Sequence, residues 1–174
     1  FDTINRMAHL LLYQDGNNET GLVNEITGYM LTVPGPVYLL RKKIRSDHGG
    51  YAYSGIRAGC TFEDDISVAE NKPGAYDVVI GVESEKFPSP LRSAEELEQH
   101  WKLITGDDVF KRTIITKDEN TIIYNYTDEQ GTFSGMECYR INDKRGVFIR
   151  IILPAQQYQA KKETMLSIIR SLSM

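Results

Sequence analysis

The chain has 174 residues, enough for one domain whose core needs neither a metal ion nor a disulfide for stability. Its composition, 41% hydrophobic and 25% charged, is that of an ordinary globular protein. The net charge of −4 argues against general affinity for nucleic acid or anionic membranes, and no apolar run approaches the roughly 18 residues of a membrane span. Because the sequence begins at Phe1 rather than Met, we expect that a preceding segment has been removed, where a signal peptide or lipid-anchor cysteine would lie.

The beginning of the chain predicts a leading helix and an exposed loop. Apolar residues recur at helical spacing over residues 2–12. The stretch Gln14–Gly21 is dense in turn-forming residues. We therefore expect residues 1–27 to form a helix and loop attached to a main domain at 28–174, the whole being one compact unit.

From Gly28 onward the apolar period shortens to two, which is the spacing of strands. Two apolar runs flank the sequence Pro34-Gly35-Pro36, which predicts a strand, a sharp turn and a second strand. Residues 56–62 and 76–82 alternate between apolar and other side chains. They predict two further strands, each with one face toward a core.

The segment Ser93–Ile104 predicts a helix. Its first serine followed by Glu96 forms a capping box, and Trp101 lies on the apolar stripe. Glu96 and His100, four residues apart, can share a face as metal ligands do. No further ligands follow at a metal-binding spacing, so we predict a solvated helix flank instead.

The second half of the chain predicts the clearest architecture. Four strand-like runs are separated by short polar turns: residues 109–117, 121–127, 131–141 and 146–154. Such spacing is typical of an antiparallel meander, and residues 155–174 then predict a closing amphipathic helix. The chain as a whole therefore predicts an α+β fold, an antiparallel β-sheet with amphipathic helices packed against it.

No catalytic constellation stands out. His9, His48 and His100 are dispersed, and the sequence has no nucleophile motif, glycine-rich phosphate loop or metal-ligand spacing. Cys60 and Cys138 both fall in strand-like apolar runs, so buried free thiols are favoured and a disulfide is the alternative. We predict no catalytic residue, no cofactor and no metal site.

The one basic cluster is the sequence RKKIR at residues 41–45. On an edge strand, such cations discourage unwanted strand pairing. The functional alternative is a docking surface for an acidic partner, extended by the glycine-containing stretch that follows. In that reading the partner contacts the cations of the cluster and the ring side chains after it: Arg41, Lys43, Arg45, His48, Tyr51 and Tyr53.

From about Met30 to Met174 the sequence resembles the Mog1/PsbP-like family of folds, which includes the bacterial DcrB-like proteins. The resembling features are the strands around the Pro-Gly-Pro turn, the strand YDVVIGVES before a proline loop, the middle helix SAEELEQHWKLI, the meander and the closing helix. The resemblance implies an antiparallel sheet sandwiched by helices in an α/β/α arrangement. It implies no shared catalytic set, so no functional residue is carried over.

Together these observations predict a non-enzymatic protein-binding accessory module. We expect an inhibitor of the immunity type, or a chaperone, that occludes a secreted effector in the bacterial periplasm or cell envelope, where a lipoprotein form would fit. The expected partner is a protein and not a nucleic acid. The alternative is an enzyme or small-ligand-binding protein with a pocket between sheet and helix, gathering His48 with nearby acids.

Overall fold

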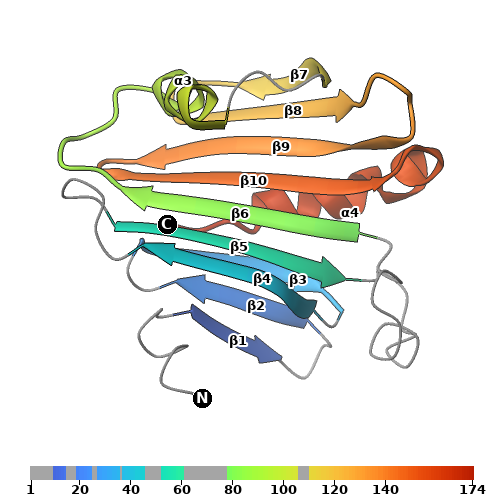
Figure 1. Cartoon of the computed structure of the whole chain (residues 1–174), viewed down its shortest axis with the longest axis horizontal. Helices are drawn as coiled ribbons and strands as arrows, with labels where there is room; N and C mark the ends of the chain where they lie inside the picture. Colours follow the sequence, from blue (N-terminus) through green and yellow to red (C-terminus); the bar gives the residue numbers. More distant parts are fainter. Residues whose placement is uncertain are drawn as a thin grey trace.

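The computed structural model describes residues 10–14, 19–24, 27–35, 37–45, 52–60, 78–105 and 110–174. The strands are β1 (Leu10–Gln14), β2 (Glu19–Asn24), β3 (Tyr29–Pro34), β4 (Val37–Arg45), β5 (Ala52–Cys60), β6 (Val78–Lys86), β7 (Lys111–Lys117), β8 (Thr121–Thr127), β9 (Phe133–Asn142) and β10 (Arg145–Pro154). They form a three-stranded sheet, β1-β2-β3, and a seven-stranded sheet in the order β4-β5-β6-β10-β9-β8-β7 (Figure 1). Every pairing is antiparallel.

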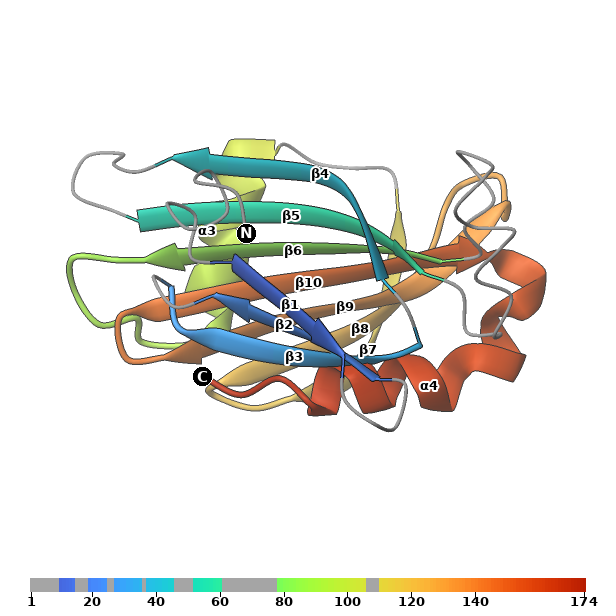
Figure 2. The same cartoon turned by 90° about the horizontal axis from the view of Figure 1, so that it is seen from below.

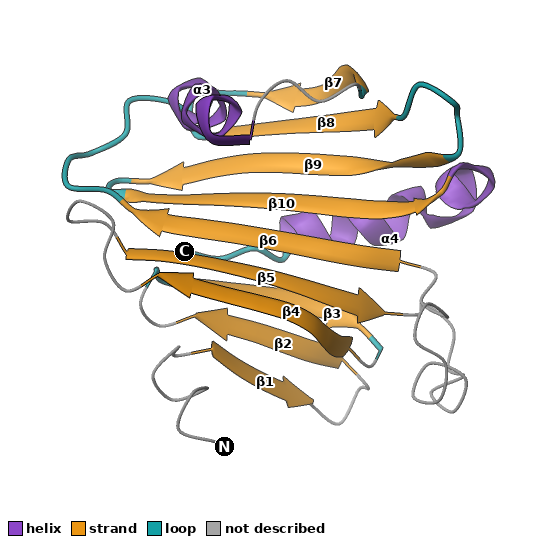
Figure 3. Cartoon of the chain, viewed as in Figure 1, coloured by secondary structure: helices purple, strands orange, loops and turns teal. Residues whose placement is uncertain are grey.

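The seven-stranded sheet is the middle layer. Helix α3 (Ala94–Thr105) lies on one face and contacts β8 and β9. Helix α4 (Tyr158–Arg170), which follows a short 3-10 turn at Ala155–Gln157, lies on the opposite face together with the three-stranded sheet (Figures 2 and 3). In the described part of the chain, neither helix is long and apolar enough to cross a membrane.

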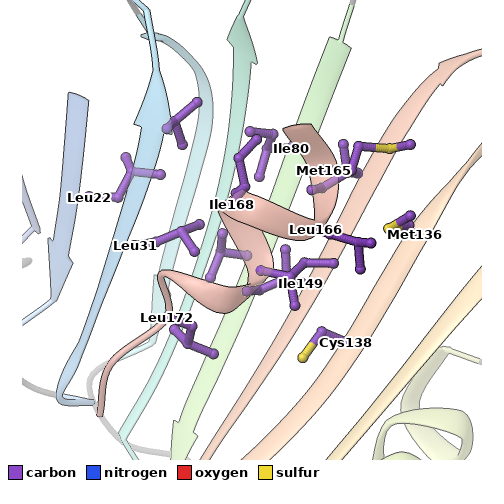
Figure 4. Packing of buried hydrophobic residues seen from close by; sticks show 14 of the residues in the cluster. Leu22, Leu31, Ile80, Met136, Cys138, Ile149, Met165, Leu166, Ile168 and Leu172 are labelled. Carbon is purple, nitrogen blue, oxygen red and sulfur yellow. The ribbon is translucent and has the colours of Figure 1, made fainter. Parts of the chain in front are cut away.

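The main core lies between the seven-stranded sheet and the layer made by α4 and β1–β3. The alternation in β6 places Val78, Ile80 and Val82 on the same buried face, and β10 supplies Ile149 opposite Val82. The other layer contributes buried side chains from β2, β3 and α4: Leu22, Leu31, Met165 and Ile168 (Figure 4). Apolar burial of this kind is the dominant stabilising term in folding.

A smaller core fixes α3 to the other face of the sheet. Leu97 and Trp101, on the apolar stripe of the helix, are buried against Ile122 and Tyr139 of the sheet. A Cβ at Gly146 would lie 2.6 Å from Leu97 Cδ1, so this close approach of helix and strand requires the glycine.

The predicted cap of α3 is present. Ser93 Oγ accepts a hydrogen bond from the Glu96 amide at 3.2 Å, and Glu96 Oε2 accepts one from the Arg92 amide at 2.8 Å. The Ser93 bond satisfies an amide that the first turn leaves without a helical partner, and the Glu96 bond fixes the amide of Arg92, which precedes the helix.

The residues after α4 connect the two sheets. Met30 and Ser173 form an antiparallel backbone bridge, with hydrogen bonds of 2.8 and 2.9 Å. Ser171 Oγ accepts from the Thr32 amide, and the Arg140 guanidinium donates to the carbonyl of Leu172. The chain end is therefore bonded to β3 on one side and to β9 on the other.

The predicted helix at 2–12 is wrong where the structure describes it, because residues 10–12 lie in β1. The predicted loop at Gln14–Gly21 is also wrong at its ends, which belong to β1 and β2; residues 1–9 and 15–18 lie outside the described part. The strand, meander and helix predictions after residue 28 are confirmed. The two-part division stays a prediction, although β2 and β3 pair across its boundary.

Cys138 is a free, buried thiol, so the disulfide alternative is wrong for this residue; the side chain of Cys60 lies outside the described part. Burial in the core raises the pKa of the Cys138 thiol to about 12. At pH 8 only about one molecule in ten thousand then carries the reactive thiolate.

We predict that iodoacetamide leaves Cys138 unmodified in the native protein and modifies it in 6 M guanidinium, read by mass spectrometry of its peptide. Rapid native-state modification would contradict this packing.

The core predicts a contrast between two isoleucines. Ile149 is completely buried at the centre of the sheet, whereas Ile114 on the edge strand β7 is 55% exposed. Ile149→Ala should lower the free energy of unfolding by about 2–5 kcal/mol, because it removes buried methyl groups and leaves a cavity. Ile114→Ala should change it by less than about 0.5 kcal/mol. Urea unfolding measures both, and equal effects would contradict the assigned core.

Candidate functional site

Within the described part of the chain, α3 covers only part of its face of the seven-stranded sheet. The helix contacts β8 and β9 near one end, and Figure 1 shows no described helix over the rest of this face. We call the region that no described helix covers the open face. Cross-strand pairing and side-chain contacts place these described residues on it: Val79, Gly81, Phe110, Arg112, Tyr126, Phe133, Glu137, Phe148, Arg150 and Ile152.

A buried carboxylate lies at the centre of the open face. The side chain of Glu137 is completely buried and directly pairs with Arg150 across β9 and β10. Glu137 Oε1 accepts a hydrogen bond from Arg112 Nε at 2.8 Å, and Oε2 accepts one from Arg150 Nη2 at 3.3 Å. We call these three residues the Glu137 cluster. Since both oxygens are bonded to guanidinium groups, the geometry suits an anchor and not a general base.

Aromatic rings surround the cations of the cluster. The guanidinium carbon of Arg150 lies 5.2 Å from the ring centre of Phe110, 5.7 Å from that of Tyr126 and 5.5 Å from that of Phe148. These distances are within the range of cation–π attraction. Arg112 also donates to the backbone carbonyl of Phe110 at 3.3 Å. The cluster therefore holds Phe110, which precedes β7, against the open face.

The side chain of Tyr126 in β8 extends over Gly135 of the neighbouring strand β9. It pairs directly with Gly135, and its hydroxyl donates to the carbonyl of Ile151 at 2.9 Å. A Cβ at Gly135 would lie 2.8 Å from the Tyr126 oxygen and 1.7 Å from the Ile151 oxygen. Only glycine permits this arrangement, which gives the open face a fixed aromatic floor.

The covered end of the same face holds two further buried carboxylates. Glu98 of α3 accepts from the Tyr124 hydroxyl at 2.9 Å and lies 3.1 Å from Lys102 Nζ. Burial and the neighbouring Glu98 raise the pKa of Tyr124 above its ordinary value. Glu85 Oε2 of β6 lies 2.9 Å from His100 Nε2. These contacts bind α3 to the sheet.

The prediction for the flank of α3 therefore needs correction at one residue. Glu96 is exposed and caps the helix, as predicted. His100 is not fully solvated: its side chain is 33% exposed, contacts Glu85, and packs edge-on against Phe87 and Trp101 at ring distances of 5.0 and 5.6 Å. No group of potential metal ligands occurs among the residues described.

A polar groove of about 530 Å³ lies at one end of the sheet, between the β7–β8 and β9–β10 turns. Its lining includes Asp118, Glu119, Arg140, Asn142 and Asp143. Arg140 and Asn142 already donate to carbonyl groups of the chain end. The groove adjoins the start of α3, because the carbonyl of Glu119 in its lining accepts a hydrogen bond from the Ala94 amide at 2.7 Å and Ile141 belongs to the smaller core.

The structure describes the backbone of some predicted partner-binding residues and leaves the others outside the described part. Arg41, Lys43 and Arg45 lie in β4, and their backbone partners in β5 are Arg57, Gly55 and Tyr53. The side chains of these β4 and β5 residues, and all of His48 and Tyr51, lie outside the described part. Their contact with a partner stays a prediction.

Sequence reasoning missed the Glu137 cluster. The indication was a glutamate within the apolar run of β9 and an arginine within the apolar run of β10. Alternation along each strand places both of these side chains on one face of the sheet. A charge in such a run implies a partner on the same face. Naming Arg150 as that partner requires the strand register, and naming Arg112 requires the order of the strands.

No family model and no curated protein matches the sequence. Among solved structures, cyanobacterial PsbP (CyanoP) from Synechocystis sp. PCC 6803 matches with a TM-score of 0.54 and 13% identity, covering 96% of this chain and 93% of that one. The extracellular domain of PknH from Mycobacterium tuberculosis gives a TM-score of 0.44 and 10% identity, covering 79% and 84%. The expected Mog1/PsbP-like α+β fold is confirmed.

The Glu137 cluster predicts a stability effect. Glu137→Gln removes the negative charge between two partly buried guanidinium groups, so it should lower the free energy of unfolding by about 3–5 kcal/mol. Glu129→Gln, at an exposed turn residue, is the matched control and should change it by less than about 0.5 kcal/mol. If urea unfolding gave similar values for both variants, the cluster would not anchor the sheet.

Proposed function

We propose that the chain is a non-enzymatic protein-binding accessory module that binds its partner on the open face. The supporting observation is the composition of this face. It combines a 46% exposed Phe133 with partly buried Phe110, Phe148, Arg112 and Arg150. Aromatic residues and arginine are enriched at the centres of protein interfaces, where they carry a large share of the binding energy.

The rigidity of the open face supports the same proposal. The Glu137 cluster joins β7, β9 and β10, and the Tyr126 hydroxyl fixes a ring against β9 and β10. A partner therefore meets side chains that are already ordered, and binding loses less conformational entropy than it would on a mobile surface.

The two edges of the large sheet are less suited to a partner. Edge strand β7 has a register shift between Ile114 and Thr116 and carries Lys111 and Lys117 near its ends. Edge strand β4 has a register shift between Leu39 and Arg41 and also contains lysines. Bulges and lysines are devices that oppose edge-to-edge strand pairing. Docking on the face is consistent with both edges being protected.

We further propose that the module acts by covering part of a secreted or envelope protein, as an inhibitor of the immunity type or as a chaperone does. Its proposed place is the bacterial periplasm or cell envelope. Support for this finer assignment comes from the sequence resemblance to the Mog1/PsbP-like family, which includes the bacterial DcrB-like proteins. The alternative, a small-ligand-binding protein, has the polar groove at the sheet end as its candidate site.

The proposal predicts that capture of a protein partner depends on the open face. Immobilised wild-type protein, incubated with envelope and secreted fractions of the native organism, should retain one stoichiometric partner identified by mass spectrometry. Phe133→Asp should weaken retention about 10- to 30-fold, because it places a charge in the apolar part of the interface.

Met30→Asp is the matched control, since Met30 is a 37% exposed apolar residue on the other sheet. Circular dichroism checks that both variants are folded. If the two variants retained every captured protein equally well, the open face would not be the binding surface and the proposal would fail.

A further inference from the structure

Along β9 and β10, the charges on the open face are confined to one cross-strand pair. The successive pairs on this face, counted away from α3, are Tyr139–Phe148, Glu137–Arg150, Gly135–Ile152 and Phe133–Pro154. The charges of the second pair are already engaged, because Glu137 accepts hydrogen bonds from both Arg150 and Arg112. The two pairs beyond it carry no ionisable side chain.

These two uncharged pairs continue into β6 as one apolar surface, which we call the apolar end: Val79, Phe133, Ile152 and Pro154. Val79 pairs directly with Ile152, and Phe133 lies diagonally across from Ile152. Direct and diagonal neighbours on one face of an antiparallel pair are within reach of each other's side chains. All four side chains are accessible, since Phe133 is 46% exposed and the other three are partly buried.

The turn before β9 fixes the position of Phe133. Asp128 Oδ1 accepts hydrogen bonds from the amide of Thr132 at 2.7 Å and from that of Phe133 at 3.1 Å. The Asp128 amide donates to the Phe133 carbonyl at 3.1 Å, and Gly131 in the same turn has a φ of 69°, which favours glycine. The Asp128 carboxylate therefore holds the backbone from which the Phe133 ring projects.

The chemistry of the apolar end determines which kind of segment it can bind. None of its four side chains can pair with a charge, and the nearest cation on β10, that of Arg150, is bonded to Glu137. A charged group buried there would lose its hydration without gaining a counter-ion. An uncharged apolar segment would instead remove apolar surface from water on both sides, and a ring on an ordered backbone loses less conformational entropy on binding.

We propose that the apolar end binds an uncharged, apolar segment of the partner protein, with Phe133 as its anchor and Asp128 as the residue that positions Phe133. This inference rests on the proposed function and names the chemistry of the segment that docks on the open face. Of the two roles proposed above, binding of an apolar segment fits the chaperone more closely than the inhibitor of charged active sites.

The test uses three ten-residue peptides that carry the same fluorophore and differ only in their central residues. Flanked by Gly-Ser-Gly on both sides, these are Leu-Val-Leu-Val, Glu-Val-Glu-Val or Lys-Val-Lys-Val. Fluorescence anisotropy should show that the Leu-Val peptide binds at least about tenfold more tightly than either charged peptide. Raising the salt from about 50 to 500 mM should not weaken its complex, because salt screens charges and this contact uses none. Equal or tighter binding of a charged peptide, or failure of the Leu-Val peptide to bind, would overturn the proposal.

Two substitutions to aspartate locate the site. Ile152→Asp should weaken binding of the Leu-Val peptide more than about tenfold, because it places a charge within the apolar end. Met30→Asp, at an exposed apolar residue of the other sheet, is the matched control and should leave binding unchanged. If circular dichroism shows that Ile152→Asp does not fold, Ile152→Thr supplies the smaller polar change and should still weaken binding. Equal affinities of the Ile152 and Met30 variants would contradict the assigned site.

Two substitutions of Asp128 test its positioning role. Asp128→Ala removes the acceptor of the Thr132 and Phe133 amides, so it should weaken binding of the Leu-Val peptide about three- to tenfold. Asp128→Asn keeps an acceptor oxygen at the same position and should bind within about twofold of the wild type. Equal losses for the two variants would show that the charge acts and not the positioned backbone, which would contradict this role.

The outcomes separate this inference from the proposed function. Partner capture that depends on Phe133 but is unaffected by Ile152→Asp would overturn the apolar end and leave the accessory role intact. Capture that is independent of Phe133 would contradict the proposed function itself. A dimer in analytical ultracentrifugation that Ile152→Asp dissociates would show that a second copy covers the apolar end. Co-sedimentation with phosphatidylcholine vesicles that requires Phe133 would show a lipid surface there, and either result would overturn the proposed occupant.

Discussion

The buried charge of Glu137 is the constraint on which the open face depends. A carboxylate without access to water is tolerated only when it is paired and hydrogen-bonded, and here the partners come from β7 and β10. Three strands must therefore stay in register for the charge to remain neutralised. The same two arginines position Phe110 and the rings around it. The requirement for charge pairing within the sheet thus also orders the surface that we propose for partner binding.

The two faces of the seven-stranded sheet differ because side chains alternate between them along the central strands β6, β10 and β9. One face buries the main core beneath α4 and the three-stranded sheet, as Figure 4 shows for Ile80, Ile149 and Ile168. The other face is closed by α3 at one end and carries aromatic, arginine and glycine positions elsewhere. The proposed binding surface therefore lies on the side of the sheet opposite the main core. A substitution on the open face that avoids the Glu137 cluster can change binding without disturbing the main core.

Much of the fold was predictable, and the limits have physical causes. Strands β6 to β10 and both helices have clear periodicity and turn or capping residues, so their positions follow from local sequence. The apolar run at residues 10–12 fits a helix or a strand, and pairing with β2 decides in favour of the strand. The Glu137 cluster was not predictable, because it joins residues up to 38 positions apart, Arg112 to Arg150, through the order and register of four strands.

Photo-cross-linking can show whether a partner lies on the open face. A benzophenone side chain is introduced at Val79 on the open face or at Glu163 on α4, and the irradiated complex is analysed by mass spectrometry. If the partner docks on the open face, position 79 gives a covalent adduct with it and position 163 gives none. An adduct from position 163 alone would place the partner on the opposite side of the sheet and rule out docking on the open face.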